Sequence, residues 1–142
     1  MSSQYVLVAL KRLVIGRANG ICEYCCSQAK YAIDSLVMEH IKPVSQGGQT
    51  LSENLALSCQ TCNNCKYTKT EAPDPATSLI VPLFHPRKMS WAEHFAWNSD
   101  ATRMIGLTPT GRATIAQLQT NRDSVVNMRR VLTVMNEHPP DL

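Results

Sequence analysis

The chain has no apolar run long enough to cross a membrane. The longest run near its N-terminus, residues 5–10, is far shorter than the roughly 20 residues that a membrane-spanning helix needs. Lys11 and Arg12 follow this run instead of preceding it, which is the wrong charge order for a secretion signal. We therefore expect a protein without a membrane segment that stays in the cytoplasm, where thiols remain reduced.

A strong charge of one sign is also missing. The 142 residues contain 14 Lys and Arg against 11 Asp and Glu, which gives a formal net charge of +3. Such a mild basic excess is compatible with a nucleic-acid partner, but many soluble enzymes share it. Internal repeats and low-complexity tracts are absent too. The composition is that of an ordinary globular protein, which excludes fibrous and disordered chains.

What the chain does contain is six cysteines, and four of them have the spacing of paired zinc knuckles. These four are Cys22, Cys25, Cys59 and Cys62. Two intervening residues let a tight turn direct both thiolates at one ion, and two such turns complete a tetrahedron. We therefore predict a structural Zn²⁺ at these cysteines, in preference to a disulfide framework or buried free thiols.

Two alternatives remain open within the cysteine set. Cys26 competes with Cys25, and Cys65 forms a second CxxC pair with Cys62. The pairs chosen above give two matching knuckles. Cys65 would lie about one helical turn after Cys62, where we expect it to pack as a small hydrophobic residue.

Apolar periodicity and turn residues predict an α+β fold. Helices are expected over residues 8–18, 62–71 and 121–136, strands over 35–44 and 51–58, and a hairpin over 91–107. Thr108-Pro109 is typical of the start of a further helix. Prolines at positions 75, 82 and 86 favour an extended connector over residues 74–86.

The C-terminal elements carry their own apolar pattern. The hairpin over residues 91–107 is expected to bury Trp91, Phe95 and Trp97. In the last helix we expect the apolar side chains to face inward, namely Val125, Met128, Val131, Leu132 and Met135. The arginines of that helix are expected mostly outward, namely Arg122, Arg129 and Arg130.

These elements divide into two expected parts. Residues 1–73 would form a zinc-stapled core with an N-terminal helix. Residues 74–142 would form a C-terminal extension, made of the connector, the β-hairpin and two helices, which packs on that core.

The segment between and just after the knuckles carries residues suited to phosphodiester hydrolysis. Glu39 and His40 are adjacent on the expected strand over residues 35–44, so their side chains should point to opposite faces. One can then ligate a metal while the other reaches an attacking water. Hydrolysis of a phosphodiester needs that separation, with a base for the nucleophile and a cation on the departing oxygen.

These residues resemble the HNH (His-Me finger, ββα-metal) endonuclease family, in its zinc-containing CxxC…CxxC branch. The resemblance covers about residues 14–70. It rests on the CxYC knuckle, Glu39-His40, Pro43 followed by Gly47-Gly48, Asn54-Leu55, and Cys62-Asn63-Asn64-x-Lys66. It implies a zinc-clamped hairpin followed by a helix, and a metal-dependent endonuclease that cleaves DNA.

The resemblance also implies a role for each site residue. His40 would be the general base, because a neutral imidazole with a pKa near ~6.5 suits that task. Glu39 and Asn63 would hold a catalytic Mg²⁺ or Mn²⁺, since oxygen ligands favour a hard cation over a second zinc. Asn54 would brace the hairpin and help to orient His40. Lys66 is a candidate contact to substrate phosphate, with a solvated helix charge as its alternative.

Several functions fit this pattern. The first is an endonuclease for double-stranded or structured DNA, acting as a monomer or homodimer. The second is a non-catalytic, zinc-stapled DNA-binding module, and an RNA-directed or toxin-like nuclease is a third. The joint presence of Glu39, His40 and Asn63 favours the enzyme, because binding alone would not require that set.

Overall fold

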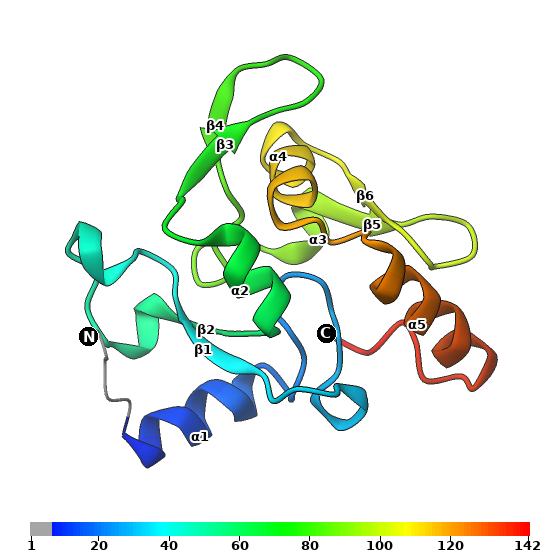
Figure 1. The fold of residues 1–142 in the computed structure, drawn as a ribbon, viewed down its shortest axis with the longest axis horizontal. Coiled ribbons are helices and arrows are strands. Elements are labelled where there is room, and N and C mark those ends of the chain that lie inside the picture. Colours follow the sequence, from blue (N-terminus) through cyan, green and yellow to red (C-terminus); the bar gives the residue numbers. More distant parts are fainter. Residues whose placement is uncertain (1–6) are drawn as a thin grey trace.

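A computed structural model describes residues 7–142 of the chain (Figure 1). Residues 1–6, and with them the start of the apolar run at residues 5–10, lie outside the described residues. Between residues 7 and 142 the chain forms helices and three two-stranded antiparallel sheets, β1-β2, β3-β4 and β5-β6. This mixture confirms the expected α+β class. No helix in this part of the chain has the length and apolar character needed to cross a bilayer.

Short elements follow one another along the chain. The helices are α1 (Val8–Arg17), α2 (Gln60–Lys66), α3 (Trp91–His94), α4 (Pro109–Leu118) and α5 (Asp123–Val134). The strands are β1 (Val37–His40), β2 (Leu55–Ser58), β3 (Glu71–Pro73), β4 (Ile80–Pro82), β5 (Phe95–Trp97) and β6 (Met104–Gly106). Single turns of 3₁₀ helix lie at Ala29–Tyr31, Val44–Gln46 and Ser52–Asn54. The expected helix over residues 62–71 is shorter than predicted, because Tyr67 leaves the helical region with a φ of 53°.

Strands β1 and β2 with helix α2 form the ββα unit that the sequence predicts. The two strands pair antiparallel, with Glu39 opposite Ala56 and His40 opposite Leu55. Leu55 packs with Val14 of α1, whereas Ala56 belongs to the larger core on the other side of the strands. Paired residues share a face of a sheet, so Glu39 faces the larger core and His40 faces the α1 side. The expected divergence of these two side chains is therefore confirmed.

The expected connector over residues 74–86 is not simply extended. Its residues Ile80–Pro82 form strand β4, which pairs with β3 and makes a hairpin that projects from the molecule (Figure 1). Asp74 closes this hairpin, because its side chain accepts hydrogen bonds from Ala76 N and Thr77 Oγ1. The prolines do not prevent pairing, because Pro73 and Pro82 sit at strand ends where a missing N–H is tolerated.

The expected hairpin over residues 91–107 is confirmed only in its second part. Residues Trp91–His94 form one helical turn, α3, and the paired strands are limited to β5 and β6. The three aromatic side chains nevertheless pack as predicted. Phe95 is buried in the main core, Trp91 and Trp97 pack against it, and the Trp91 and Phe95 ring centroids are 5.2 Å apart.

Helix α5 is turned differently from the prediction. Val125, Val126 and Leu132 are buried as an inward face requires, but Arg129 is buried with them and only 3% exposed. Three apolar residues expected to face inward are exposed instead, namely Met128, Val131 and Met135. The prediction was wrong for these residues because it assumed that an arginine faces solvent. In the structure Arg129 takes the inward position instead.

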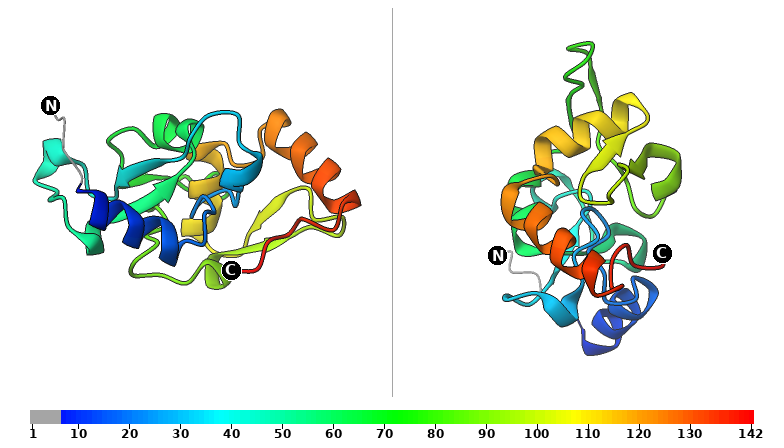
Figure 2. Two further views of the ribbon diagram at one scale, coloured as in Figure 1. Left: turned by 90° about the horizontal axis from the view of Figure 1, so that it is seen from below. Right: turned by 90° about the vertical axis from the view of Figure 1, so that its right-hand side faces the viewer.

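The two expected parts of the chain share one core. Cys62 and Ala56 of the ββα unit lie in the same buried cluster as Phe95 and Leu118 of the later elements. Helices α1 and α5 lie far apart, and the C-terminal segment runs back from α5 toward the loop that follows α1 (Figure 2). The proposed boundary between residues 73 and 74 falls inside the β3-β4 hairpin. A division of the chain at that point stays a prediction.

Candidate metal and catalytic site

Four cysteine sulfurs come together between the two knuckles. They belong to Cys22, Cys25, Cys59 and Cys62, and all lie within 4.8 Å of one another. A tetrahedral ion with Zn–S bonds of ~2.3 Å separates neighbouring sulfurs by ~3.8 Å. The Sγ atoms of Cys25 and Cys59 are 3.7 Å apart. The cluster therefore fits a structural Zn²⁺, and the choice of these four among the six cysteines is confirmed.

Local backbone geometry builds each knuckle. In the first, Cys26 N donates to Cys22 O and thereby closes a tight turn. In the second, Cys59 caps the N-terminus of α2, and its Sγ accepts a hydrogen bond from Cys62 N. Hydrogen bonding from Cys22 lowers the pKa of Cys25, and it lowers that of Cys59 to about 7. Burial raises the pKa of Cys22, and hydrogen bonding from Cys22 raises that of Cys62, so only two of the four thiols favour the metal-binding thiolate form in the absence of an ion.

The remaining two cysteines stay outside the cluster. Cys26 directly follows the first knuckle in a left-handed conformation, with a φ of 67°, and burial raises its pKa. Cys65 is half-buried one turn after Cys62, and its carbonyl accepts a hydrogen bond from Gln117 Nε2.

Glu39 lies at the centre of a buried polar network. The side chain is 2% exposed, and both of its carboxylate oxygens accept hydrogen bonds. Tyr24 Oη donates to Oε1 at 2.5 Å, and Lys66 Nζ donates to Oε2 at 2.9 Å. Burial raises the pKa of the Glu39 carboxyl, while Lys66 and Tyr24 act against that rise. Tyr24 stands between Cys22 and Cys25 in the sequence, so the first knuckle carries one donor of this network.

The structure places Lys66 away from any surface where it could meet substrate. Its side chain is only 1% exposed, and Nζ donates to Ile41 O at 2.8 Å as well as to Glu39. This arrangement matches neither the phosphate contact nor the solvated helix charge considered above. Lys66 instead compensates the charge of the buried Glu39 carboxylate, whose other oxygen accepts a hydrogen bond from Tyr24.

His40 lies on the opposite face of β1 and is half-buried. Its Nε2 lies 2.9 Å from Thr50 Oγ1. Burial lowers the pKa of the imidazole, which favours the neutral form at neutral pH. With Nε2–H assigned as the donor to Thr50, Nδ1 keeps a lone pair that can accept a proton.

Asn54 ties down the loop that follows β1. Its Nδ2 donates to Lys42 O and Gln49 O at 3.0 and 2.9 Å, and its Oδ1 accepts from Lys42 N at 2.9 Å. Gly48 is also required here, because a Cβ at this position would lie 1.8 Å from Lys42 O. The loop thus has a fixed path up to Thr50, the hydrogen-bond partner of His40.

Asn63 lies in α2, one turn before Lys66. It is half-buried, and within residues 7–142 its side-chain amide makes no hydrogen bond. Residues three apart on a helix are neighbours on its surface. Asn63 therefore offers an unengaged amide oxygen from a position that neighbours Lys66 on the surface of α2.

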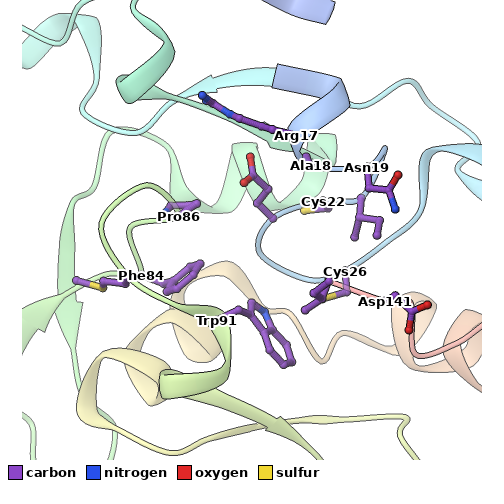
Figure 3. A pocket seen from close by; sticks show the side chains of 13 residues that line it. Arg17, Ala18, Asn19, Cys22, Cys26, Phe84, Pro86, Trp91 and Asp141 are labelled. Atoms are coloured by element: carbon purple, nitrogen blue, oxygen red, sulfur yellow. The ribbon is translucent and has the colours of Figure 1, made fainter. Parts of the chain in front are cut away.

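A separate cavity lies on another side of the first knuckle (Figure 3). Its volume is about 340 Å³, and Cys22, Cys26, Phe84 and Trp91 are among the residues that line it. None of the four candidate catalytic residues lines this cavity. It is therefore not the site that the sequence pattern describes.

Sequence reasoning missed three residues that the structure brings to these centres. Tyr24 and Thr50 contact Glu39 and His40, and Arg122 contacts the cysteines. Tyr24 could have been identified from the sequence, because it lies within the CxYC motif. Thr50 and Arg122 had no signal in the pattern, since their partners lie 10 and about 60 residues away.

A family model described as HNH endonuclease matches residues 22–69. The matched segment begins at the first cysteine of the cluster and ends just after Lys66. It therefore includes the cysteines, the β1-β2 pair, α2 and all four candidate catalytic residues. A comparison with curated proteins gave no match.

Proposed function

We propose that this chain, whose residues 22–69 match a family model described as HNH endonuclease, hydrolyses phosphodiester bonds of DNA in a metal-dependent reaction with His40 as the general base. The observation that carries this proposal is the setting of His40. Its imidazole is half-buried, favours the neutral form and is held at Nε2 by Thr50. A general base needs a nitrogen with an available lone pair, and with Nε2–H donating to Thr50 that nitrogen is Nδ1.

The chemical role of His40 follows from its two ring nitrogens. Nδ1 removes a proton from a water molecule, the resulting hydroxide attacks the phosphorus, and the P–O bond to the departing sugar oxygen breaks. Nε2–H stays on Thr50 Oγ1, which keeps the ring oriented and stabilises the imidazolium after proton transfer. Asn54 acts indirectly, because it fixes the loop that leads to Thr50.

Glu39 and Asn63 are the proposed protein ligands of the catalytic cation. A carboxylate offers about four lone-pair sites on its two oxygens, so the bonds from Tyr24 and Lys66 leave each Glu39 oxygen a further lone pair. Asn63 adds a neutral amide oxygen. Such a sparse oxygen set suits Mg²⁺ or Mn²⁺, but water and phosphate can complete the shell only if Glu39, which is 2% exposed in this structure, becomes accessible to them. When bound, this cation would stabilise charge on the departing oxygen.

The substrate proposal is double-stranded or structured DNA. One HNH site contains one general base and therefore cuts one strand in each encounter. A double-strand break would need a homodimer or two successive encounters. The mild net charge of +3 is compatible with a polyanionic substrate.

A second candidate function has an observation of its own. The Glu39 carboxylate is buried and its charge is already compensated by Lys66. A carboxylate whose role is to bind a metal cation needs no such lysine partner. This pairing favours a zinc-stapled DNA-binding module that does not cleave. The two candidates differ in one measurable property, which is whether metal-dependent cleavage occurs.

A plasmid-nicking assay tests the proposal. Wild type is compared with His40→Ala in Mg²⁺, in Mn²⁺ and in chelator, and we expect only metal-loaded wild type to nick DNA. Loss of a general base should reduce the rate by roughly 10²- to 10⁴-fold. His94→Ala is the matched control, because it removes a similar histidine–threonine hydrogen bond outside the site and should leave cleavage intact.

The outcomes separate the candidates. Equal cleavage by wild type and His40→Ala would remove His40 from the mechanism. Binding of DNA by wild type without cleavage, in either metal, would favour the non-catalytic module. Zinc content is measured on every protein, so that a folding defect is not mistaken for a catalytic one.

A further inference from the structure

A guanidinium group from the C-terminal part of the chain lies against the cysteine cluster. Arg122, directly before α5, places Nη2 3.3 Å from Cys59 Sγ and Nη1 3.8 Å from Cys62 Sγ. Nη1 also donates to Gln119 O at 3.1 Å, which fixes the orientation of the group. Arg122 lies outside residues 22–69, the segment that matches the family model.

The charge of the cluster explains why a cation is stabilising there. Four thiolates around one Zn²⁺ carry a net charge of −2, and this charge lies in a mostly buried environment. Hydrogen bonds from a charged donor are roughly twice as strong as neutral ones. Among the described residues no other basic side chain donates a hydrogen bond to a cysteine sulfur. Arg122 is therefore the direct source of charge compensation in this part of the chain.

A second arginine holds the other knuckle. Arg129, seven residues later and buried on the same side of α5, places Nη2 2.9 Å from Cys25 O and 2.8 Å from Thr120 O. Its guanidinium lies over the Trp97 ring at 5.0 Å from the centroid. Arg122 thus contacts the sulfurs of the second knuckle while Arg129 contacts the backbone of the first. The position of α5 is coupled to both halves of the cluster.

We propose that Arg122 is a positioning residue of the zinc centre, which retains the metal by compensating the charge of Cys59 and Cys62. Arg129 supports this arrangement by anchoring α5 to the first knuckle. The C-terminal extension is then a working part of the zinc site and not only a domain packed beside it. The proposal does not depend on whether the protein cleaves DNA.

Zinc release to a chelator is the first measurement. The full-length zinc-loaded protein is compared with Arg122→Gln and Arg122→Lys, and release is followed with a metallochromic dye. Loss of such an outer partner typically weakens metal binding by about 10- to 100-fold, so we expect Arg122→Gln to release zinc faster by roughly that factor. Arg122→Lys should fall between, because it keeps the charge but loses the two-donor fork.

Arg130→Gln is the matched control. Arg130 lies on the same helix and is exposed, and its guanidinium donates to Asn127 Oδ1. The change removes one positive charge from α5 without touching the cluster. We expect wild-type release of zinc from this variant.

Cobalt substitution separates a direct contact from simple packing. Hydrogen bonds to a thiolate stabilise its lone pairs, so the thiolate-to-Co²⁺ charge-transfer bands should move to lower energy when Arg122 becomes Gln. Wild-type release together with unchanged bands would overturn the proposal. Faster release with unchanged bands would also overturn it, because Arg122 would then act only by holding α5 in place.

The proposal can still be tested if Arg122→Gln fails to fold. If that variant cannot be loaded with metal, the cobalt spectrum of Arg122→Lys decides the question. A band shift in Arg122→Lys supports a direct role for the guanidinium. Bands identical to wild type would contradict it.

Discussion

Helix α2 connects two polar centres that are completed in different ways. The Glu39–Lys66 pair, near the C-terminal end of α2, gains its third member from Tyr24 and so lies entirely within residues 22–69. The cysteine cluster, at the N-terminal end of α2, gains Arg122 from outside that segment. The segment that matches the family model is therefore shorter than the set of residues that holds the site together.

Net charge accounts for this difference. Glu39 and Lys66 neutralise each other, so their buried network needs no further cation. A tetrathiolate zinc site keeps an excess negative charge, and a nearby guanidinium stabilises it. Changes at the cluster should thus be felt across both parts of the chain, whereas changes at Glu39 and Lys66 should act within the ββα unit.

The largest effect is expected from breaking the cysteine cluster. Cys59→Ser removes one of the four sulfurs, and zinc binding contributes apparent folding free energy on the order of 10 kcal/mol. We expect loss of zinc and of cooperative thermal unfolding. Cys65→Ser is the matched control, because Cys65 lies outside the cluster. A folded, zinc-free Cys59→Ser protein would show that the zinc is dispensable.

An intermediate effect is expected from breaking the neutral pair. Lys66→Met leaves the Glu39 carboxylate buried without its cation, and removal of one partner of a buried ion pair costs about 3–5 kcal/mol. Urea unfolding measures this loss. Lys69→Met, a change at an exposed lysine, should be close to neutral.

A double substitution sharpens that result. Combining Lys66→Met with Glu39→Gln removes both charges, so the double variant should be more stable than Lys66→Met alone. If the two losses simply add, the ion pair does not exist in solution and the contrast between the two centres fails.

The smallest effect is expected from a third charged contact, which joins the β3-β4 hairpin to α4. Arg112 donates to both oxygens of Asp74, and this holds the pKa of Asp74 below its ordinary value of about 3.9. A lowered carboxyl pKa gives stability that is complete above the ordinary pKa and lost as the pH falls below it. Asp74→Asn should therefore be less stable than wild type at pH 7.

The pH dependence is the check on this contact. Thermal unfolding between pH 7 and pH 2 should show the difference between wild type and Asp74→Asn shrinking below about pH 4. A constant difference across that range would mean that the charge of Asp74 is not what stabilises the hairpin.

The sequence predicted best what is encoded by local spacing. Two CxxC pairs identified the four clustered cysteines, and strand alternation separated Glu39 from His40. Thr108-Pro109 marked the start of α4, where Thr108 Oγ1 accepts a hydrogen bond from Gly111 N. In each case the physical cause lies within a few residues, so the pattern could express it.

The sequence predicted least where a charged residue has a distant partner. Lys66 and Arg129 were assigned to the outside, yet their partners are 27 and 104 residues away in the chain. Apolar periodicity predicts that every charged residue faces solvent, because the pattern contains no information about a partner far away in the chain. The error in the face of α5 followed directly from Arg129. The catalytic roles of Glu39, His40, Asn54 and Asn63 stay predictions until cleavage is measured.

Tyr24 gives the cysteine cluster an influence beyond stability. It belongs to the first knuckle, and its hydroxyl contacts the carboxylate beside His40. Because Tyr24 lies between two cysteines of the cluster, an ion bound there would also hold this hydroxyl in place against Glu39. Zinc loading of the knuckle and the arrangement of the buried Glu39 network are therefore coupled through a single side chain.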